Sequence, residues 1–495
     1  KSPTSGGNSL FKAGTYTGTG KGNNDSITVE VTFTDTEIAS ITIKEHQETA
    51  GISDPAIEKI PQSVMSSQSL AVDTVAGATK SSKGILEAIE DCVVQAGGDA
   101  EQLKTAANQT AKTKTEESRD TDVIVVGSGI TGMSAALSAK EAGADVVVIE
   151  KQAVTGGTTA IAGGYLISID SKLYDDTDFD DSLDTFRKYW DERMSYSGQQ
   201  SGYPDETRWE EIVSKTGETV DWLQEKAVTW EVFTGFGPYP TAHNPLGGRG
   251  LIDEMVKIAE NQGIEVITEC KGEKLVIDDQ GAVVGVVAET ADKVITFNAS
   301  SVVLATGGIS ANGEMVKQYS PKVAQAQTIS VAAAGSTGDG MTMALEAGAV
   351  PFENFFTSIC ATTVDPRLAS QVEEAAKLTT NKQLGVNAKG ERFASESAVY
   401  YDALGSDMIQ DGNAPFYYIY DSSDADTAAI LEKGAAAGAV VKADTIEALA
   451  EGMKVDAAAL KASFDRYNQQ AEAGKDEDFG KSPENLVVLD QAPYY

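Results

Sequence analysis

Two short segments of this chain combine glycine, serine and threonine at spacings that suit phosphate binding. The first runs Val123-Ile-Val-Val-Gly127-Ser-Gly129-Ile-Thr-Gly132, a G-x-G-x-x-G pattern directly after an apolar run. In this pattern the first glycine turns the chain, the second admits a pyrophosphate, and the third lets helix and strand pack. We expect a helix at residues 133–142 whose N-terminus faces the phosphate charge. The segment predicts a dinucleotide site.

The residues after this helix fit the same interpretation. A second apolar run at residues 146–149 predicts a strand, and it ends in Glu150, about twenty positions after the glycines. A carboxylate at this position can accept hydrogen bonds from a ribose hydroxyl. Because strand, helix, second strand and acid fall in this order, the pattern favours a dinucleotide fold over a glycine-rich turn that binds no nucleotide.

The second segment, Asp73-Thr-Val-Ala-Gly-Ala-Thr79-Lys-Ser-Ser82, precedes a predicted amphipathic helix. Apolar residues at positions 85, 89, 92 and 93 recur at i, i+4, i+7 and i+8 and indicate that helix. The small residues at 76–78 let a ligand approach the backbone, and Thr79 stands at the helix start, where the dipole favours a phosphate. On spacing alone, an ordinary Ser/Thr-rich helix cap remains the alternative.

The elements around these segments predict several domains. Strands with period-two alternation at residues 27–33 and 38–43, followed by the amphipathic helix, indicate a small α+β unit. Later signals are a buried strand at 302–305, a strand–turn–strand at 385–393 and helices at 445–467. The predicted divisions are a tether at 1–10, the small domain at 11–98, a polar linker at 99–120, an α/β domain at 121–352, a capping domain at 353–480 and a return to the α/β domain at 481–495.

Composition excludes several functions. The chain has 495 residues and a net charge of −36, so a nucleic acid is not an expected partner. Three widely spaced cysteines form no CxxC pair, which argues against a disulfide framework, an iron–sulfur site, haem attachment or another metal site. No apolar run is long enough to cross a membrane.

The small domain resembles an FMN-binding domain in which a flavin transferase joins FMN to a threonine through a phosphodiester. The resemblance rests on residues 46–54 (HQETAGISD) and on the segment from Val72 to Ser82. It implies covalent FMN at Thr79, with Asp73, Gly77 and Ala78 in the transferase recognition motif. Members of this family usually have serine where Ala76 stands.

The larger part of the chain, from about Asp122 onward, resembles the flavoproteins of fumarate reductase and succinate dehydrogenase. The resemblance rests on the glycine segment, on residues 150–164 and 305–308, and on the segments 335–340 and 384–396. It implies an α/β fold, namely a Rossmann-like FAD-binding domain with an inserted α+β capping domain, preceded by the small α+β domain. The residues that it implies for non-covalent FAD binding are Gly127, Gly129, Gly132, Glu150, Lys151, Gly157, Thr158, Thr159, Gly164, Thr306, Gly307 and Asp339.

The expected substrate site departs from this family. The chain has only two histidines, His46 and His243, and residues 357–361 (TSICA) stand where the family has His-Pro-Thr. Counting on from residues 390–393, Tyr400 takes the place of the proton-donating arginine, unless the alignment slips onto Tyr401. A tyrosine can donate a proton but cannot pair with a carboxylate through two hydrogen bonds. We therefore expect an enoate or enone rather than fumarate; the alternative is that Tyr400 only packs the cap.

The resemblance implies a two-flavin reductase in which electrons pass from FMN to FAD and then, as hydride, to an activated C=C bond that serves as terminal electron acceptor. No second G-x-G-x-x-G is visible, so the expected electron donor is a membrane chain or an extracellular carrier. Two alternatives stay open: a flavin dehydrogenase of a ketosteroid-like substrate, and a non-catalytic, flavin-tethered electron carrier.

The ends of the chain and its tethered flavin suggest a location. The polar stretch Lys1 to Asn8 resembles the tether left after a secretory or lipoprotein signal is removed. We expect an extracytoplasmic protein at a bacterial cell surface or in the periplasm, and a lipid anchor through a lost N-terminal segment is one form that this location can take. Relatives continue beyond Tyr495 with a glycine-rich segment, so we also expect a truncated form that holds FAD weakly, whose final strand at 486–489 would lead into that segment.

Overall fold

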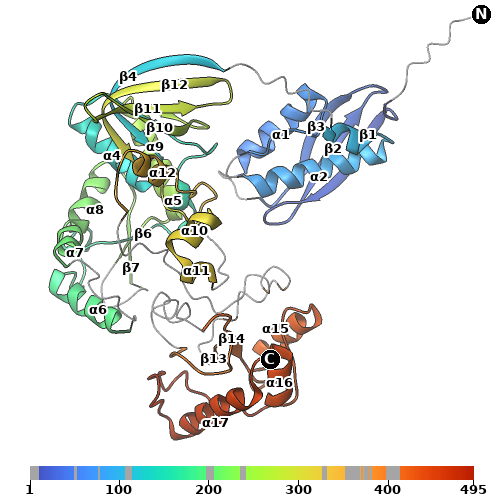
Figure 1. Cartoon of the computed structure of the whole chain (residues 1–495), viewed down its shortest axis with the longest axis vertical. Helices are drawn as coiled ribbons and strands as arrows, with labels where there is room; N and C mark the ends of the chain where they lie inside the picture. The colour runs from blue at the N-terminus through green and yellow to red at the C-terminus, as the bar shows by residue number, and fades with distance from the viewer. Residues whose placement is uncertain are drawn as a thin grey trace, which may run out of the picture.

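The structure is a computed structural model, and Figure 1 shows its three parts. An N-terminal domain is drawn in blue, a central domain runs from cyan to yellow, and a C-terminal region is orange and red. The structure describes residues 10–48, 53–75, 78–105, 114–196, 206–234, 241–325, 332–351, 368, 372, 378, 382–396 and 413–495.

The N-terminal domain packs helices against one antiparallel sheet. Its elements are β1 (Gly14–Lys21), β2 (Ser26–Phe33), β3 (Ile38–Glu45), α1 (Asp54–Ser67), α2 (Thr79–Gln95) and α3 (Ala100–Thr105), with strand order β1-β2-β3. The predicted alternation in β2 is confirmed, because Ile27, Val29 and Val31 are fully buried. The apolar stripe of α2 packs in the same core. A Cβ at Gly20 would collide with the backbone of Gly84, so α2 lies directly on β1.

The predicted linker at 99–120 is wrong at both of its ends. Helix α3 belongs to the N-terminal domain, where Leu70 N donates to Leu103 O at 3.1 Å. Strand β4 (Thr115–Val126) starts before the apolar run and pairs in parallel with β12 (Lys293–Leu304). The first half of β4 is polar, and this pairing with a strand far along the chain makes it part of a sheet. Residues 106–113 lie outside the described part of the chain.

The central domain is built on a six-stranded sheet of order β10-β11-β12-β4-β5-β9. Strands β12, β4, β5 and β9 are parallel, whereas β10, β11 and β12 are antiparallel. The predicted strand at 146–149 is confirmed as β5. The remaining strands are β5 (Val146–Ile149), β9 (Glu265–Ile267), β10 (Lys271–Ile277) and β11 (Val283–Glu289).

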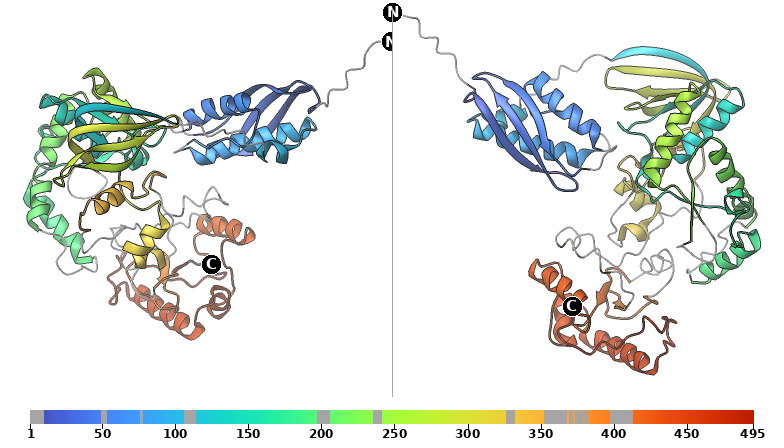
Figure 2. Two further views of the ribbon diagram at one scale, coloured as in Figure 1. Left: turned by 45° about the horizontal axis from the view of Figure 1, so that its top comes forward. Right: turned by 180° about the vertical axis from the view of Figure 1, so that it is seen from behind.

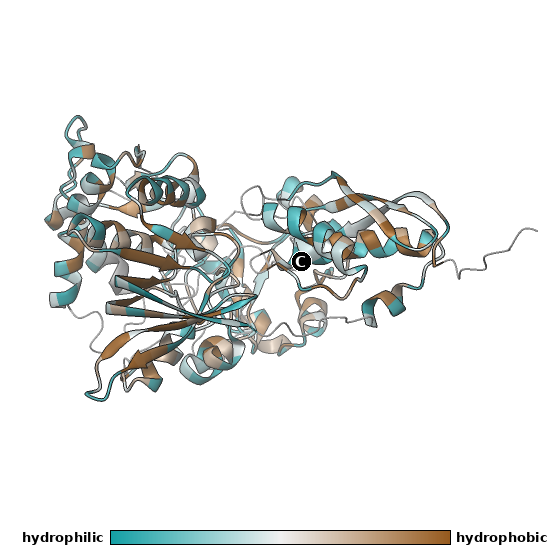
Figure 3. Cartoon of the chain, turned by 90° about the horizontal axis from the view of Figure 1, so that it is seen from above, coloured by the Kyte–Doolittle hydropathy of each residue, from teal (hydrophilic) through white to brown (hydrophobic). Residues whose placement is uncertain are grey.

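The hydrophobic core lies on both faces of this sheet. Because neighbouring residues of a strand point to opposite faces, Val125 and Val148 pack with α4, α8 and α9, whereas Ile124 and Ile149 pack with β10 to β12 and with Met343 of α12. In Figure 3 the strands of the central domain have brown, hydrophobic stretches beside teal, hydrophilic ones. The helices are α4 (Ile130–Glu141), α5 (Gly157–Ile161), α8 (Thr216–Glu225), α9 (Gly247–Asn261), α10 (Gly313–Tyr319), α11 (Pro321–Gln325) and α12 (Asp339–Glu346).

A small antiparallel sheet of order β6-β8-β7 lies beside the main one. Next to it, Phe186 and Trp209 stack in a separate aromatic cluster between α6 and α7. The elements are β6 (Tyr165–Ile167), the 3₁₀ helix η1 (Lys172–Tyr174), α6 (Leu183–Tyr196), α7 (Glu206–Val213), β7 (Glu231–Phe233) and β8 (Thr241–His243).

The C-terminal region has a core of its own, and it contradicts the predicted return of residues 481–495 to the FAD-binding domain. Leu486 and Leu489 pack with Leu460 and Tyr467 of α17. Residues 486–489 are not a strand, because the Asn468 side chain takes the place of a strand partner and bonds Leu489 N and O, each at 2.9 Å. The elements are β13 (Leu384–Val386), β14 (Tyr417–Ile419), α15 (Ala425–Ala436), α16 (Ile446–Met453) and α17 (Ala457–Ala473).

Among the described helices, none has the length and apolar character that crossing a membrane would need.

Candidate functional site

A cavity of about 340 Å³ opens where the parallel strands β4, β5 and β12 end. This is the edge of an α/β sheet at which nucleotides bind, because the helix that follows the first strand directs its N-terminus there. The residues that line the cavity are Val126, Gly127, Ser128, Gly129, Ile130, Thr131, Ile149, Glu150, Lys151, Gln152, Gly157, Thr158, Thr159, Cys270, Lys271, Gly272, Leu304, Ala305, Thr306, Gly307, Ala333, Gly335, Ser336 and Asp339.

The three glycines of the G-x-G-x-x-G segment have different surroundings. Gly127 has φ +109°, and an added Cβ would collide with the carbonyl oxygen of Ala305. A Cβ at Gly132 would collide with the carbonyl oxygen of Gly127, so this glycine serves packing and lies outside the cavity. Gly129 lines the cavity, and the nearest atom to an added Cβ would be Gly156 O at 3.6 Å. Only Gly129 keeps open space in front of the helix.

Glu150 holds the glycine segment in shape. The side chain is buried, and its Oε2 accepts hydrogen bonds from Ser128 N at 3.0 Å and from Ser128 Oγ at 2.6 Å. Its Oε1 accepts from Gln152 N at 2.9 Å. A carboxylate can accept about four hydrogen bonds, so Glu150 still has capacity for a ribose hydroxyl.

Polar contacts join the other loops around the cavity. Lys151 Nζ forms an ion pair with Asp339, the first residue of α12, and donates to Thr337 Oγ1 at 2.6 Å. Thr159 Oγ1 accepts from Ile130 N at 3.2 Å, and Thr306 Oγ1 accepts from Gly340 N at 3.1 Å. In the same way, Thr158 Oγ1 accepts from Ala333 N at 3.1 Å. These side chains position the backbone of the cavity.

One observation that does not depend on a sequence pattern supports the binding of FAD in this cavity. Gln152 lines it, and its Oε1 is buried without a hydrogen-bond partner in the described chain. A buried acceptor without a partner costs about 1–3 kcal/mol, so this atom suits a ligand that brings a donor, such as a ribose hydroxyl or an adenine amino group. Together with the open N-terminus of α4, this makes the cavity suitable for the adenosine diphosphate half of FAD.

The structure separates some predicted residues from the site and adds others. Gly164 lies outside the cavity, because its backbone packs directly against Gly247. Sequence reasoning missed Cys270 and Gly272, which line the cavity at the start of β10. A glycine inside a strand pattern marks a close backbone approach, and that signal was present at Gly272. Burial raises the pKa of the Cys270 thiol to about 11, so Cys270 contributes packing rather than reactivity.

Thr79 is exposed and is the first residue of α2. The loop before it is held by Ser82, whose Oγ accepts from Val75 N at 3.0 Å and donates to Ala78 O at 2.9 Å. Asp73 is exposed on this loop, and Gly77 lies outside the described residues. The predicted attachment residue is therefore accessible at the start of α2.

A buried carboxylate supports the first turn of α2. Glu48 accepts hydrogen bonds from Ser81 Oγ, from Asn24 N at 2.8 Å and from Asn23 N at 3.1 Å. Burial acts to raise the pKa of the Glu48 carboxyl, but these hydrogen bonds outweigh it and hold that pKa below its usual value. Nearby in sequence, His46 Nδ1 is buried without a partner in the described chain, which fits a bound FMN.

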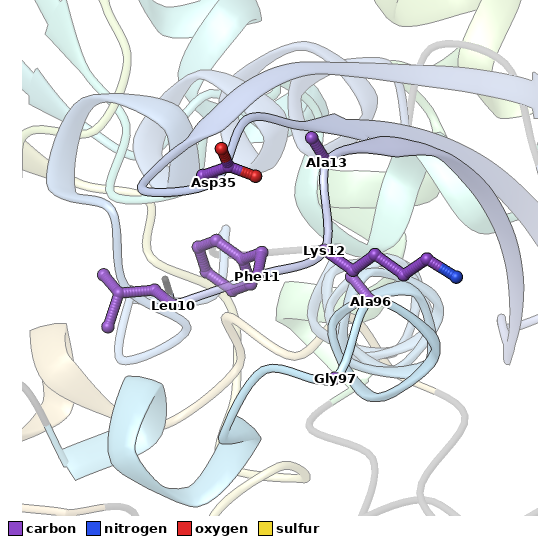
Figure 4. Close-up of a pocket in the computed structure, with 7 residues that line it drawn as sticks. All are labelled: Leu10, Phe11, Lys12, Ala13, Asp35, Ala96 and Gly97. Carbon is purple, nitrogen blue, oxygen red and sulfur yellow. The ribbon is translucent and has the colours of Figure 1, made fainter. Parts of the chain in front are cut away.

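A second hollow, of about 550 Å³, contains none of the predicted residues. It lies between Phe11, Asp35 and Ala96, as Figure 4 shows. Lys12 N donates to Ala96 O at 2.8 Å, which places the hollow where α2 ends, whereas Thr79 begins that helix. We assign no ligand to it.

The predicted substrate residues fall mostly outside the described chain, including Tyr400 and residues 357–361. His243 is described, and its ring stacks on Tyr165 with centroids 4.4 Å apart and planes 18° apart. The ring centroid of Phe233 lies 4.8 Å from that of Tyr165. These three rings form an aromatic cluster in the small sheet. Its first strand, β6, follows α5 by a few residues, and the first residues of α5 line the cavity.

Comparison with known proteins agrees with this geometry. Residues 122–495 match the family described as FAD binding domain, and residues 22–94 match the FMN-binding domain. The chain belongs to the FAD-binding flavoprotein family. The predicted fold class is thereby confirmed, as is the pair of cofactors, FAD and FMN.

Two relatives cover nearly the whole chain. The NADH:acrylate oxidoreductase of Vibrio harveyi is 29% identical over 98% of this chain and 54% of its own length. The urocanate reductase of Eggerthella lenta is 29% identical over 97% of this chain and 80% of its own length. The chain thus spans about half the length of the Vibrio protein.

Two solved flavoproteins share the fold. The 3-ketosteroid-Δ4-(5α)-dehydrogenase of Rhodococcus jostii is 26% identical, with a TM-score of 0.59 over 78% of this chain and 84% of that one. A flavocytochrome c3 fumarate reductase in an open conformation is 26% identical, with a TM-score of 0.51 over 80% of this chain and 68% of that one. The predicted resemblance to fumarate reductase flavoproteins is confirmed.

Proposed function

We propose that this protein is a two-flavin reductase of an activated C=C bond in an enoate or enone. The observation that carries the proposal is that one chain contains both the cavity with its unpaired Gln152 acceptor and the exposed Thr79 of an FMN-binding domain. When bound, FAD supplies hydride to carbon and FMN supplies electrons one at a time. The net reaction adds two electrons and two protons to the double bond.

In this proposal some side chains and backbone groups of the protein bind the flavins, and others hold the surrounding loops in position. The open N-terminus of α4 at Gly129 receives the pyrophosphate, and Glu150 and Gln152 accept hydrogen bonds from the adenosine part. The Lys151–Asp339 ion pair fixes the rim. Thr79 holds the FMN phosphate covalently at the start of α2, next to Ala78, whose carbonyl oxygen accepts a hydrogen bond from Ser82 Oγ.

The proposed acceptor is a planar conjugated molecule rather than fumarate. Of the two histidines, His243 is engaged in a stack with Tyr165, and such a cluster favours an aromatic or conjugated group over a dicarboxylate. The names of two relatives, for acrylate and urocanate, are consistent with an enoate. Tyr400 is the proposed donor of the proton to the second carbon.

The rival function is a dehydrogenase of a ketosteroid-like substrate, and the Rhodococcus fold supports it. The FMN-binding domain argues for reduction, because it provides an entry for electrons. Turnover with reduced viologen, compared with turnover with an oxidising dye, separates the two directions. A non-catalytic electron carrier would give neither activity and would bind no FAD.

We also propose a location and partners for this reductase. A flavin transferase attaches FMN, and a membrane or extracellular carrier donates electrons. Covalent attachment retains FMN where free flavin would be lost by diffusion, which suits an extracytoplasmic protein at a bacterial surface or in the periplasm. Fractionation of the native host, with flavin fluorescence in denaturing gels, tests this location; fluorescence confined to the cytoplasm contradicts it.

The central experiment measures flavin after acid precipitation of protein made in a host that has the transferase. We expect FMN in the pellet and FAD in the supernatant. Thr79→Ala should abolish pellet FMN, whereas Thr36→Ala, a change of the same kind at an exposed position elsewhere in the same domain, should leave it intact. Pellet FMN that survives in Thr79→Ala overturns the assignment of Thr79. Pellet FMN without soluble FAD points to the electron carrier, or to the expected truncated form that holds FAD weakly.

A further inference from the structure

One end of the N-terminal domain faces the central domain. Helices α1 and α2 both begin at that end, and Figures 1 and 2 show it adjacent to the central domain. The β1–β2 turn lies there too, since Glu48 bonds both Asn24 N and the Ser81 hydroxyl of α2. The exposed Thr79 is therefore at the end of the domain that approaches the FAD cavity.

At this end the described residues include one charged and one apolar contact between the domains. Lys59 of α1 forms an ion pair with Glu269 of the central domain. Ala153 of the central domain packs against the hydrophobic core of the N-terminal domain. One charged and one apolar contact thus lie on two loops, 150–153 and 269–270, that are distant in sequence but joined by backbone hydrogen bonds.

These two loops form the wall of the cavity. Glu269 N donates to Gln152 O at 3.0 Å, and Cys270 N donates to Glu150 O at 2.9 Å. Glu150, Gln152 and Cys270 line the cavity. The N-terminal domain therefore contacts the outer side of the same backbone whose inner side lines the FAD cavity. Glu269 itself has φ +53°, a left-handed conformation that is uncommon for a residue other than glycine.

From this arrangement we propose that Lys59 and Glu269 are positioning residues that dock the FMN-binding domain on the wall of the FAD cavity. The docked pose sets the distance over which electrons pass from FMN at Thr79 to FAD. Two single-electron transfers deliver one electron pair to FAD together with one proton from water, and no covalent bond forms between the domains. The inference rests on the proposed two-flavin function.

Charge and exposure explain why one ion pair matters here. The chain carries a net charge of −36, so two acidic surfaces would repel each other unless a cation lies between them. The Lys59 and Glu269 side chains are 41% and 48% exposed, so the pair is weak and is screened by salt. A weak contact suits docking that forms and releases, and the transfer rate should fall as ionic strength rises.

Charge reversal tests the proposal in the full-length, flavin-loaded protein. Lys59→Glu and Glu269→Lys are each compared with the double swap, and Lys44→Glu serves as the matched control because Lys44 pairs with Glu30 inside the N-terminal domain. We expect each single reversal to slow inter-flavin electron transfer after a laser flash by about tenfold, and to raise the radius of gyration in X-ray scattering. The double swap should restore both values, and the control should change neither.

Single reversals that leave both the rate and the scattering unchanged overturn the proposal, as does a double swap that restores neither. Flavin content separates this failure from failure of the proposed function. If acid-precipitated wild-type protein contains no FMN at Thr79, the two-flavin function is wrong, while the scattering comparison still decides whether Lys59 and Glu269 dock the domains.

Discussion

Lys151 and Asp339 form an ion pair at the rim of the FAD cavity although 188 positions separate them in the chain. Lys151 lies two residues after the end of β5, and Asp339 begins α12. Thr337 contacts both partners, since its Oγ1 accepts from Lys151 Nζ at 2.6 Å and donates to Asp339 Oδ2 at 3.1 Å. The pair therefore fixes the loop 333–339 against the loop that carries Gln152.

Breaking this pair should weaken FAD binding. In Asp339→Asn the rim loses a partly buried charge pair, so we expect the dissociation constant for FAD to rise about tenfold, or 1.4 kcal/mol. Flavin fluorescence titration of FAD-free protein measures it. Asp465→Asn is the control, because that residue pairs with Lys461 on the exposed face of α17. Equal affinities for both variants would contradict a role of the pair in the site.

Substitution by alanine should have opposite effects on FAD binding and on stability at two glycines that are close in sequence. Gly129 has φ −67° and room for a Cβ, so Gly129→Ala should leave unfolding almost unchanged but block FAD, because the methyl group enters the cavity. Gly132→Ala places the methyl group against the Gly127 carbonyl, so it should destabilise the central domain by about 1–3 kcal/mol. Urea unfolding and FAD retention, measured on both variants, distinguish steric block from misfolding.

An element could be predicted from the sequence when its cause is local, and was missed when a distant part of the chain determines it. The strand β5 and the stripe of α2 were predicted because buried runs and helical periodicity are local signals. The polar half of β4 was missed because β12, far along the chain, makes it a strand. The end of the chain was misplaced because Asn468 forms hydrogen bonds with Leu489, and no sequence pattern indicates these bonds. Cavity residues such as Cys270 were missed for the same reason, since only the folded sheet brings them there.

Glu48 predicts a pH dependence of the N-terminal domain. Its pKa is held low in the folded state, so it stabilises the fold above its unfolded pKa of about 4.3, and the contribution disappears as the pH falls through the folded pKa. Glu48→Gln should cost about 1–2 kcal/mol near pH 7, and little at acidic pH. Hydrogen exchange of peptides from α2 measures the difference, with the exposed Glu45→Gln as control. A deficit that is equal at both pH values would show that Glu48 acts through packing alone.

A buried set of charges holds the C-terminal region together. The Glu396 carboxylate accepts from Gly385 N at 2.9 Å, pairs with Arg392 at 2.9 Å and lies 3.3 Å from Lys481 Nζ. Arg392 also pairs with Asp476 at 2.7 Å, so two cations balance two anions. Burial lowers the pKa of Lys481 to about 8, although the Glu396 carboxylate acts to raise it.

Glu396→Gln should therefore leave an unbalanced positive charge and destabilise this region by about 3–5 kcal/mol at neutral pH. The pKa of Lys481 should fall further in the variant, so Lys481 can lose its proton at a lower pH. When the folded-state pKa of a lysine is depressed, the folded state becomes more stable as the pH rises through that pKa, because the buried amine loses its charge. The stability deficit of Glu396→Gln relative to wild type should therefore shrink as the pH approaches 8. Hydrogen exchange of peptides from α16 and α17 measures it, with Glu391→Gln as the exposed control. A deficit independent of pH would mean that Lys481 keeps its proton and that the lost ion pair with Arg392 accounts for the change.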